Sequence, residues 1–217
     1  RSCLEIPSGL VWTRWSLPTC LIWCLVGAPG SIGADGPSDR SVRLIMKIVL
    51  LGYRAVGKST LGMLVAQHLG WPYQDIDRGI EAAVGQSITE FYQTQGDAAY
   101  RTVESEVVAQ MCRSEHCVIA FGAGSVMRPA NRAHARHDAL VFYLQASPQV
   151  LWDRMRGDPA SASTRPPLGS GGYEEVVEML AQRQAAYIEC ADVVLDATCT
   201  PESLAEQVIE AYERCRK

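Results

Sequence analysis

The chain has 217 residues, of which 47% are hydrophobic and 20% are charged, a composition typical of one globular domain with a tail. Its formal net charge of −4 argues against general nucleic-acid binding, which usually needs a basic face, and no apolar run is long enough to span a membrane. The 8 cysteines include no Cys-x-x-Cys pair, so we expect free thiols in a reducing compartment, the cytoplasm.

The first 45 residues differ in composition from the rest of the chain. They contain no lysine, they end in a stretch rich in glycine, proline and serine, and the first methionine, Met46, stands where a buried strand is expected to begin. We therefore expect residues 1–45 to be a disordered or non-native extension and residues 46–217 to form the working domain. The alternative is a targeting segment, because residues 17–28 form a short apolar run after Arg14.

A phosphate-binding pattern follows the first expected strand. Residues 46–51 are mostly apolar, residues 52–60 read G-x-x-x-x-G-K-S-T, and apolar residues then recur at helical spacing up to Leu69, which is the strand, loop and helix order of a P-loop. Backbone N–H groups and the positive helix end bind phosphate there, Lys58 reaches the β- and γ-phosphates, and Ser59 is placed to bind Mg²⁺. The alternative is a chance glycine-rich turn. The expected nucleotide-binding residues of this loop are Gly52, Ala55, Val56, Gly57, Lys58, Ser59 and Thr60.

Strands and helices alternate along the rest of the domain. The expected strands and extended segments are 46–51, 71–77, 118–121, 139–144 and 193–195. The expected helices are 58–69, 78–84, one starting at Ser87 with a capping box to Glu90, 97–113, one starting at Ser147, 173–189 and one starting at Pro201. Such repeated units predict the α/β class, a P-loop NTPase-like three-layer α/β/α arrangement with a central, mostly five-stranded parallel sheet. Residues 157–172, rich in glycine, proline and serine, predict a long mobile loop.

Several short motifs, taken in order and spacing, resemble the shikimate kinase family over nearly all of residues 46–217. They are the P-loop, Asp75-Ile76-Asp77, Tyr100-Arg101 with Glu104, Gly122-Ala123-Gly124, Arg165-Pro166, and Arg183 with Tyr187. The resemblance implies ATP-dependent phosphorylation of shikimate to 3-phosphoshikimate in aromatic amino acid biosynthesis, with ATP and Mg²⁺ required. The resemblance also implies that the matching residues of this chain have the roles that they have in the family. We expect a monomer that binds neither nucleic acid nor membrane.

Two acids follow the second expected strand, and they are two residues apart. On an extended segment Asp75 and Asp77 would point to opposite sides, one toward the nucleotide and one toward the acceptor. The resemblance implies that Asp75 helps to hold Mg²⁺ through its water shell and that Asp77 binds the acceptor hydroxyl and can take its proton. The alternative is a solvated turn or a helix N-cap.

Two arginines far apart in the sequence complete the expected acceptor site. A guanidinium suits a carboxylate because it can donate two parallel hydrogen bonds, and the resemblance implies that Arg101 and Arg183 bind the shikimate carboxylate. The alternatives are an exposed ion pair of Arg101 with Glu104 and a solvated helix face for Arg183.

The remaining expected contacts lie in two loops and one helix. By the resemblance, the backbone of Gly122, Ala123 and Gly124 approaches the substrate, although the family has glycine at the middle position. Alanine is tolerated there if its φ is negative. The resemblance also makes residues 157–172 a lid whose Arg165 stabilises the transferring phosphoryl group. Arg154 best matches the arginine that stacks on adenine, with Arg156 as a competitor.

Other functions leave different marks in a sequence. A kinase for gluconate or a nucleoside monophosphate is one alternative, but one acid and two arginines suit an acidic polyol better. A nucleotide-binding module without catalysis is another, and loss of Lys58, Ser59 or Asp77 would indicate it. All three residues are present.

Overall fold

The computed structural model describes residues 10–17, 20–27, 45–157 and 172–216, with only the backbone described for the first two ranges. Five parallel strands form the centre of the domain, and they follow the spatial order β4-β5-β3-β6-β7. These strands are β3 (Lys47–Leu51), β4 (Tyr73–Asp75), β5 (Cys117–Ala120), β6 (Ala139–Gln145) and β7 (Val193–Asp196). The predicted five-stranded parallel sheet is therefore confirmed.

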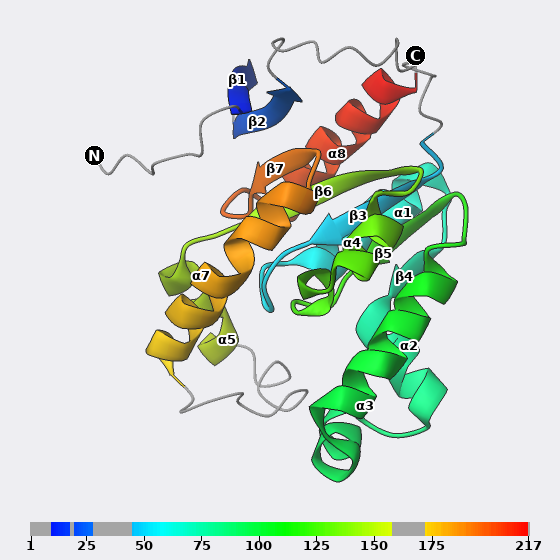
Figure 1. Ribbon diagram of the computed structural model, residues 1–217. Helices are drawn as coiled ribbons and strands as arrows, with labels where there is room; N and C mark the ends of the chain where they lie inside the picture. The colour runs from blue at the N-terminus through cyan, green and yellow to red at the C-terminus, as the bar shows by residue number, and fades with distance from the viewer. Residues whose placement is uncertain (1–9, 18–19, 28–44, 158–171, 217) are drawn as a thin grey trace, which may run out of the picture.

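Helices cover both faces of this sheet (Figure 1). The helices are α1 (Lys58–Leu69), α2 (Ile76–Val84), α3 (Ile88–Met111), α4 (Pro129–Arg136), α5 (Pro148–Gly157), α7 (Tyr173–Cys190) and α8 (Pro201–Cys215), with one 3₁₀ turn, η1 (Ser125–Met127). Helices α1 and α8 pack together on one face, and α4 and α7 lie over the other. All five residues of β3 are buried, as a central parallel strand with both faces covered requires.

Helix α3 consists of two helical stretches that meet at a kink, as the sequence predicts. The Ser87 side chain accepts a hydrogen bond from the Glu90 N–H, and the Glu90 side chain accepts one from the Ser87 backbone N–H, so the capping box is present. The sequence predicts a separate helix over 97–113, and the structure has the break directly before it, at Gly96, where φ is 79° and ψ is 176°, with the second stretch ending at Met111. Glycine allows this break because no Cβ opposes a positive φ.

The sheet continues beyond the five parallel strands into the N-terminal region. Strands β1 (Leu10–Leu17) and β2 (Cys20–Gly27) pair antiparallel with each other, and β2 pairs antiparallel with β7 through Trp23 and Val194. The edge of β7 offers backbone groups with which β2 can pair. The expectation that residues 1–45 are a disordered or non-native extension stays a prediction. That residues 46–217 suffice as the working domain stays a prediction.

Two sequence-based expectations concern cysteines and membranes. Cys112, Cys117 and Cys190 carry free thiols, as expected. Cys199 is in a disulfide, so the expectation of free thiols is wrong for this residue. Within the described ranges, none of the helices combines the length and the apolar character that crossing a bilayer requires.

Candidate active site

The P-loop connects the carboxyl end of β3 to the start of α1. Gly52 (φ 147°) and Gly57 (φ 105°) both have a positive φ, and a Cβ on Gly52 would lie 2.8 Å from the Leu144 carbonyl oxygen. Glycine is therefore required at Gly52 by both conformation and space. Ala55 also lies in the left-handed region, with φ 59°, although it carries a Cβ. The loop is held in shape by its neighbours and stores some strain at Ala55.

Lys58 turns back over the loop that it follows. Its Nζ donates to the Gly52 and Tyr53 carbonyl oxygens, both at 2.9 Å. An ammonium has three donors and no acceptor, so these two contacts place the charge over the phosphate-binding loop while the group stays able to turn toward a ligand. The position agrees with the role that the sequence predicts for Lys58.

Ser59 and Asp75 meet beside the loop. The Ser59 hydroxyl donates to Asp75 Oδ2 at 3.4 Å, and the Tyr73 hydroxyl donates to the same oxygen at 3.0 Å. Asp75 Oδ1 accepts from the Asp77 N–H at 2.9 Å, which makes Asp75 the N-cap of α2. The N-cap alternative is therefore right for Asp75, yet the same carboxylate also faces Ser59.

Asp77 lies in a different conformation from the one expected. Helix α2 begins at Ile76, so Asp77 is in its first helical turn and the extended segment ends at Asp75. The two acids therefore do not alternate across a strand; the Asp75 cap turns the chain into a helix before Asp77. The Asp77 side chain is half-buried, and its proposed contact with the acceptor stays a prediction.

A first pocket opens on one side of the P-loop. Its lining residues come from the loop, α1, α5 and the segment from Ala197 to Leu204: Ala55, Val56, Gly57, Thr60, Leu61, Arg154, Ala197, Cys199, Pro201 and Leu204. Arg154 donates to the Val56 carbonyl oxygen at 3.2 Å and to the Ala197 carbonyl oxygen at 2.7 Å. Arg156 is exposed. The structure thus places Arg154 rather than Arg156 beside this pocket.

A second pocket opens on the other side of the loop and brings together residues from four segments. It is lined by Tyr53, Arg54, Ile88, Tyr92, Tyr100, Arg101, Ala123, Gly124, Glu175 and Arg183. Four of these, Arg101, Ala123, Gly124 and Arg183, are acceptor-site residues that the sequence predicts. Gly122 is buried and precedes the lining residues of its loop. Arg165 and most of the expected lid lie outside the described residues.

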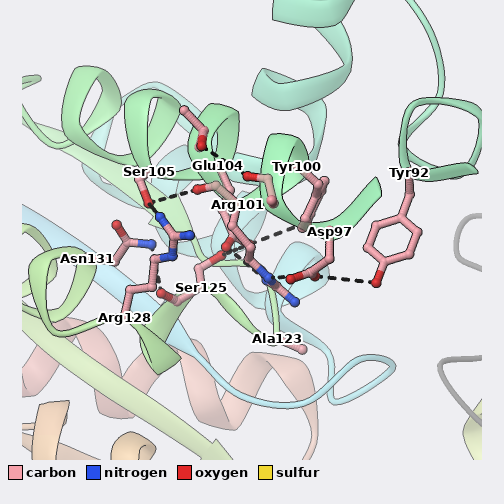
Figure 2. Close-up of polar contacts among 12 residues, drawn as sticks. Tyr92, Asp97, Tyr100, Arg101, Glu104, Ser105, Ala123, Ser125, Arg128 and Asn131 are labelled. Atoms are coloured by element: carbon pink, nitrogen blue, oxygen red, sulfur yellow. Dashed lines mark hydrogen bonds and ion pairs between the residues drawn. The ribbon is translucent and has the colours of Figure 1, made fainter. Parts of the chain in front are cut away.

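One buried and one exposed acid, Glu104 and Asp97, hold the Arg101 side chain in this pocket (Figure 2). Its Nη1 lies 2.9 Å from Glu104 Oε2, and its Nε lies 3.2 Å from Asp97 Oδ1. Glu104 is only 1% exposed, so this pair is not the exposed one that the alternative supposed. Burial works against the charge of Arg101, but Glu104 outweighs it, with a smaller contribution from Asp97, and the net effect is a raised pKa. Arg101 therefore stays cationic at all ordinary pH values.

A hydrogen-bond chain continues from Glu104 to the loop on the far wall. The Ser125 hydroxyl donates to Glu104 Oε1 at 2.8 Å, and the Asn131 side chain donates to the Ser125 carbonyl oxygen at 2.9 Å. Ser125 and Asn131 are at most 1% exposed. Because buried hydrogen bonds to a charged group are strong and geometrically specific, this chain sets the direction of Arg101. Sequence reasoning missed both residues, since only the fold brings them to Glu104.

Arg183 is buried too, at 9% exposure, so the solvated-face alternative is wrong. Its guanidinium carbon lies 5.6 Å from the centroid of the Tyr53 ring, a cation–π geometry. One turn further along α7, the Tyr187 hydroxyl donates to the Ala123 carbonyl oxygen at 2.5 Å. This bond ties α7 to the loop that carries Ala123 and Gly124.

The loop of Gly122, Ala123 and Gly124 accepts alanine at its middle position. Within the described ranges, a positive φ on a residue with a side chain occurs at Ala55, His116 and Asp138, so Ala123 lies outside the left-handed region and pays no such penalty. At Gly124, space favours glycine, because a Cβ there would lie 3.0 Å from Arg101 Nη1. The glycine lets the guanidinium approach the loop.

This chain is similar to known proteins in both sequence and structure. A family model described as shikimate kinase matches residues 54–213. The chain is 35% identical to the shikimate kinase of Thermodesulfovibrio yellowstonii over 168 residues, which cover 77% of this chain and 95% of the relative. It is 38% identical to the shikimate kinase of Thiobacillus denitrificans over 150 residues, 69% of this chain and 80% of the relative. The solved structure of shikimate kinase from Bacteroides thetaiotaomicron superposes with a TM-score of 0.70 at 26% identity, covering 77% of this chain and 98% of that one.

Proposed function

This chain belongs to the shikimate kinase family, and we propose that the two pockets beside its P-loop divide the reaction of that family between them. The enzyme transfers the γ-phosphoryl group of ATP to a hydroxyl of shikimate. The observation that carries our assignment of the pockets is the meeting of Arg101 and Arg183 beside the Ala123-Gly124 loop, next to the P-loop. Two guanidiniums converging on one cavity suit an acceptor with a carboxylate.

ATP occupies the P-loop and the first pocket in this proposal. Backbone N–H groups of residues 52–60 bind the phosphates at the positive end of α1. The Lys58 ammonium leaves the Gly52 and Tyr53 carbonyl oxygens, where it lies at 2.9 Å, and turns to the β- and γ-phosphates. Arg154 stacks on the adenine from the pocket wall.

The oxygen atoms of Ser59 and Asp75 fit Mg²⁺. Hard oxygen ligands are what this ion prefers, and it usually keeps several waters beside one or two protein groups. The 3.4 Å between Ser59 Oγ and Asp75 Oδ2 places both oxygens at one point beside the loop, with Ser59 as the direct ligand and Asp75 acting through water. When bound, Mg²⁺ neutralises negative charge on the phosphates.

The acceptor occupies the second pocket. Arg101, held by Glu104 at 2.9 Å, and Arg183, resting over Tyr53, bind the carboxylate from two walls. Such a grip orients the hydroxyl toward the γ-phosphate before reaction, which supplies much of the rate enhancement in phosphoryl transfer. Asp77 binds the attacking hydroxyl and takes its proton, and Arg165 neutralises charge on the moving group. A monomeric state and a cytoplasmic location stay predictions.

A coupled ADP-release assay tests the proposal with a panel of acceptors. Shikimate should support turnover, and gluconate and nucleoside monophosphates should not. A nucleoside monophosphate has no carboxylate for Arg101 and Arg183, and gluconate is an open chain without the ring that fixes the hydroxyls of shikimate relative to its carboxylate. Turnover with a nucleoside monophosphate and none with shikimate would refute the acceptor assignment. ADP release with no acceptor preference would indicate a simple ATPase.

A further inference from the structure

Arg54 is a residue of the P-loop whose side chain faces away from the nucleotide pocket. It occupies one of the unspecified positions of the G-x-x-x-x-G-K-S pattern, where nothing in the motif requires a charge. Its side chain lines the acceptor pocket together with Arg101 and Arg183. The pocket thus holds a third guanidinium, supplied by the loop that binds the phosphates.

One donor of Arg54 is buried without a partner. Its Nε lies away from solvent and has no hydrogen-bond acceptor within the described part of the chain. Nearly all buried donors in native proteins are paired, so an unsatisfied donor on a residue that lines a pocket indicates a ligand that would pair with it. The Arg54 guanidinium therefore brings to the pocket a donor that the described part of the protein leaves unsatisfied.

All three guanidiniums of the pocket contact protein groups as well. Arg101 is paired with Asp97 and Glu104 at 3.2 and 2.9 Å, and Arg183 contacts Met179 Sδ at 3.4 Å and the Tyr53 ring. Burial raises the pKa of Tyr53, while the charges of Arg54 and Arg183 and a side-chain hydrogen bond with Arg54 oppose the rise, and the Nε of Arg54 is left without a partner within the described residues. Arg54 and Arg183 therefore flank the same tyrosine and share one wall of the pocket.

We propose that Arg54 is a third acceptor-binding residue, which donates from the P-loop to the carboxylate that Arg183 also binds. The inference rests on the proposed function and names a contact beyond it. A carboxylate offers about four lone-pair sites and accommodates more than one guanidinium. Because Arg54 belongs to the phosphate-binding loop, this contact also fixes the acceptor relative to the nucleotide.

The first test compares Arg54→Met with Arg113→Met in the full chain. Methionine removes the donors and keeps an unbranched side chain; Arg113 is exposed beyond the end of α3 and controls for loss of one charge. Loss of a charge-assisted hydrogen bond should raise the shikimate Kd, measured by calorimetry without nucleotide, about tenfold or more. The Kd for ATP should stay within about threefold, and an unchanged melting temperature shows that Arg54→Met folds.

The second test replaces the acceptor carboxylate by its uncharged carboxamide. Wild type should bind the amide much less well than shikimate, and the penalty from Arg54→Met should become much smaller on the amide, because the anion that Arg54 contacts is gone. Arg54→Lys should recover only part of the shikimate affinity, since an ammonium lacks the planar fork.

Two outcomes would overturn the inference. One is an unchanged shikimate Kd in Arg54→Met; a reduced kcat beside it would assign Arg54 to the transferring phosphoryl group. The other is an equal penalty on shikimate and its amide, which would assign Arg54 to a hydroxyl. Each leaves the proposed function intact, whereas a wild type that neither binds nor phosphorylates shikimate would refute that function.

Discussion

The nucleotide side and the acceptor side of this site are built in opposite ways. The nucleotide side consists mainly of consecutive residues, 52–60, whose backbone and glycines define the loop. The acceptor side gathers single side chains from the P-loop, α3, the 123–124 loop and α7. A ligand of nearly invariant shape, a phosphate chain, is bound by backbone geometry, whereas a particular small acid is bound by side chains held at chosen angles.

The two sides should differ in how well they tolerate changes of side chain. A backbone loop keeps its N–H groups when its side chains change, so the unspecified positions of a P-loop are open to new roles, as at Arg54. The acceptor side depends on charges, and the charge of Arg101 depends on a buried partner, Glu104. Substitutions on the two sides should therefore affect different kinetic constants.

Lys58→Ala should have the largest effect, because it removes the ammonium charge that we assign to the β- and γ-phosphates. We expect kcat to fall by at least about 10³-fold, the size of effect known for charges that stabilise the transferring phosphoryl group. The shikimate Kd should change little. ADP release and calorimetry measure the two quantities, and activity within a few-fold of wild type would contradict the P-loop assignment.

Arg101→Ala and Arg183→Ala should have the second-largest effect, and they should affect the acceptor kinetics and leave ATP binding unchanged. Loss of charge-assisted hydrogen bonds should lower kcat/KM for shikimate about ten- to a hundred-fold. The Kd for ATP without acceptor should stay near its wild-type value, since the two residues line the second pocket only. If both variants kept normal acceptor kinetics, the carboxylate would have to be bound elsewhere.

Ser125→Ala probes the support behind Arg101 and should have a smaller effect. The substitution removes the 2.8 Å hydrogen bond to Glu104, and leaving a buried acceptor short of a partner costs about 1–3 kcal/mol. We expect a lower melting temperature and a several-fold higher KM for shikimate, with KM for ATP unchanged.

Ser105→Ala is the matched control for Ser125→Ala. The Ser105 hydroxyl donates to the Arg101 carbonyl oxygen at 3.0 Å within α3, so its loss should leave both KM values alone. A Ser125→Ala variant that matched this control in acceptor KM would show that Glu104 holds Arg101 without help.

Ala55→Gly should have the smallest effect, and it should be favourable. Glycine adopts φ 59° without the Cβ penalty that Ala55 bears, so we expect stabilisation of up to about 1 kcal/mol and a melting temperature about 2–4 °C higher. Ala185→Gly, at an exposed position inside α7, should lower stability by about 0.5–1 kcal/mol. Calorimetric scans that gave both changes the same sign would show that the loop is unstrained.

Local features were readable from the sequence because neighbouring residues decide them. The P-loop, the Ser87 capping box and the five parallel strands depend on short patterns and on the periodicity of apolar residues. The early start of α2 at Ile76 was missed, although Asp75 is a favourable N-cap residue. Residue order alone leaves such boundaries open, because a cap and a strand end compete for the same residue.

Only the tertiary structure decided what surrounds each predicted side chain. The sequence predicts Arg101 and Arg183 as acceptor-binding arginines, but it could not reveal that Glu104 is 1% exposed, that Ser125 donates to it at 2.8 Å, or that Arg54 lines the same cavity. The pairing of β2 with β7 could not be predicted from the sequence either. These contacts join residues that are distant along the chain, and their geometry arises only when the sheet and helices pack. Sequence alone therefore determined which chemical groups are available, while packing determined their partners, burial and direction.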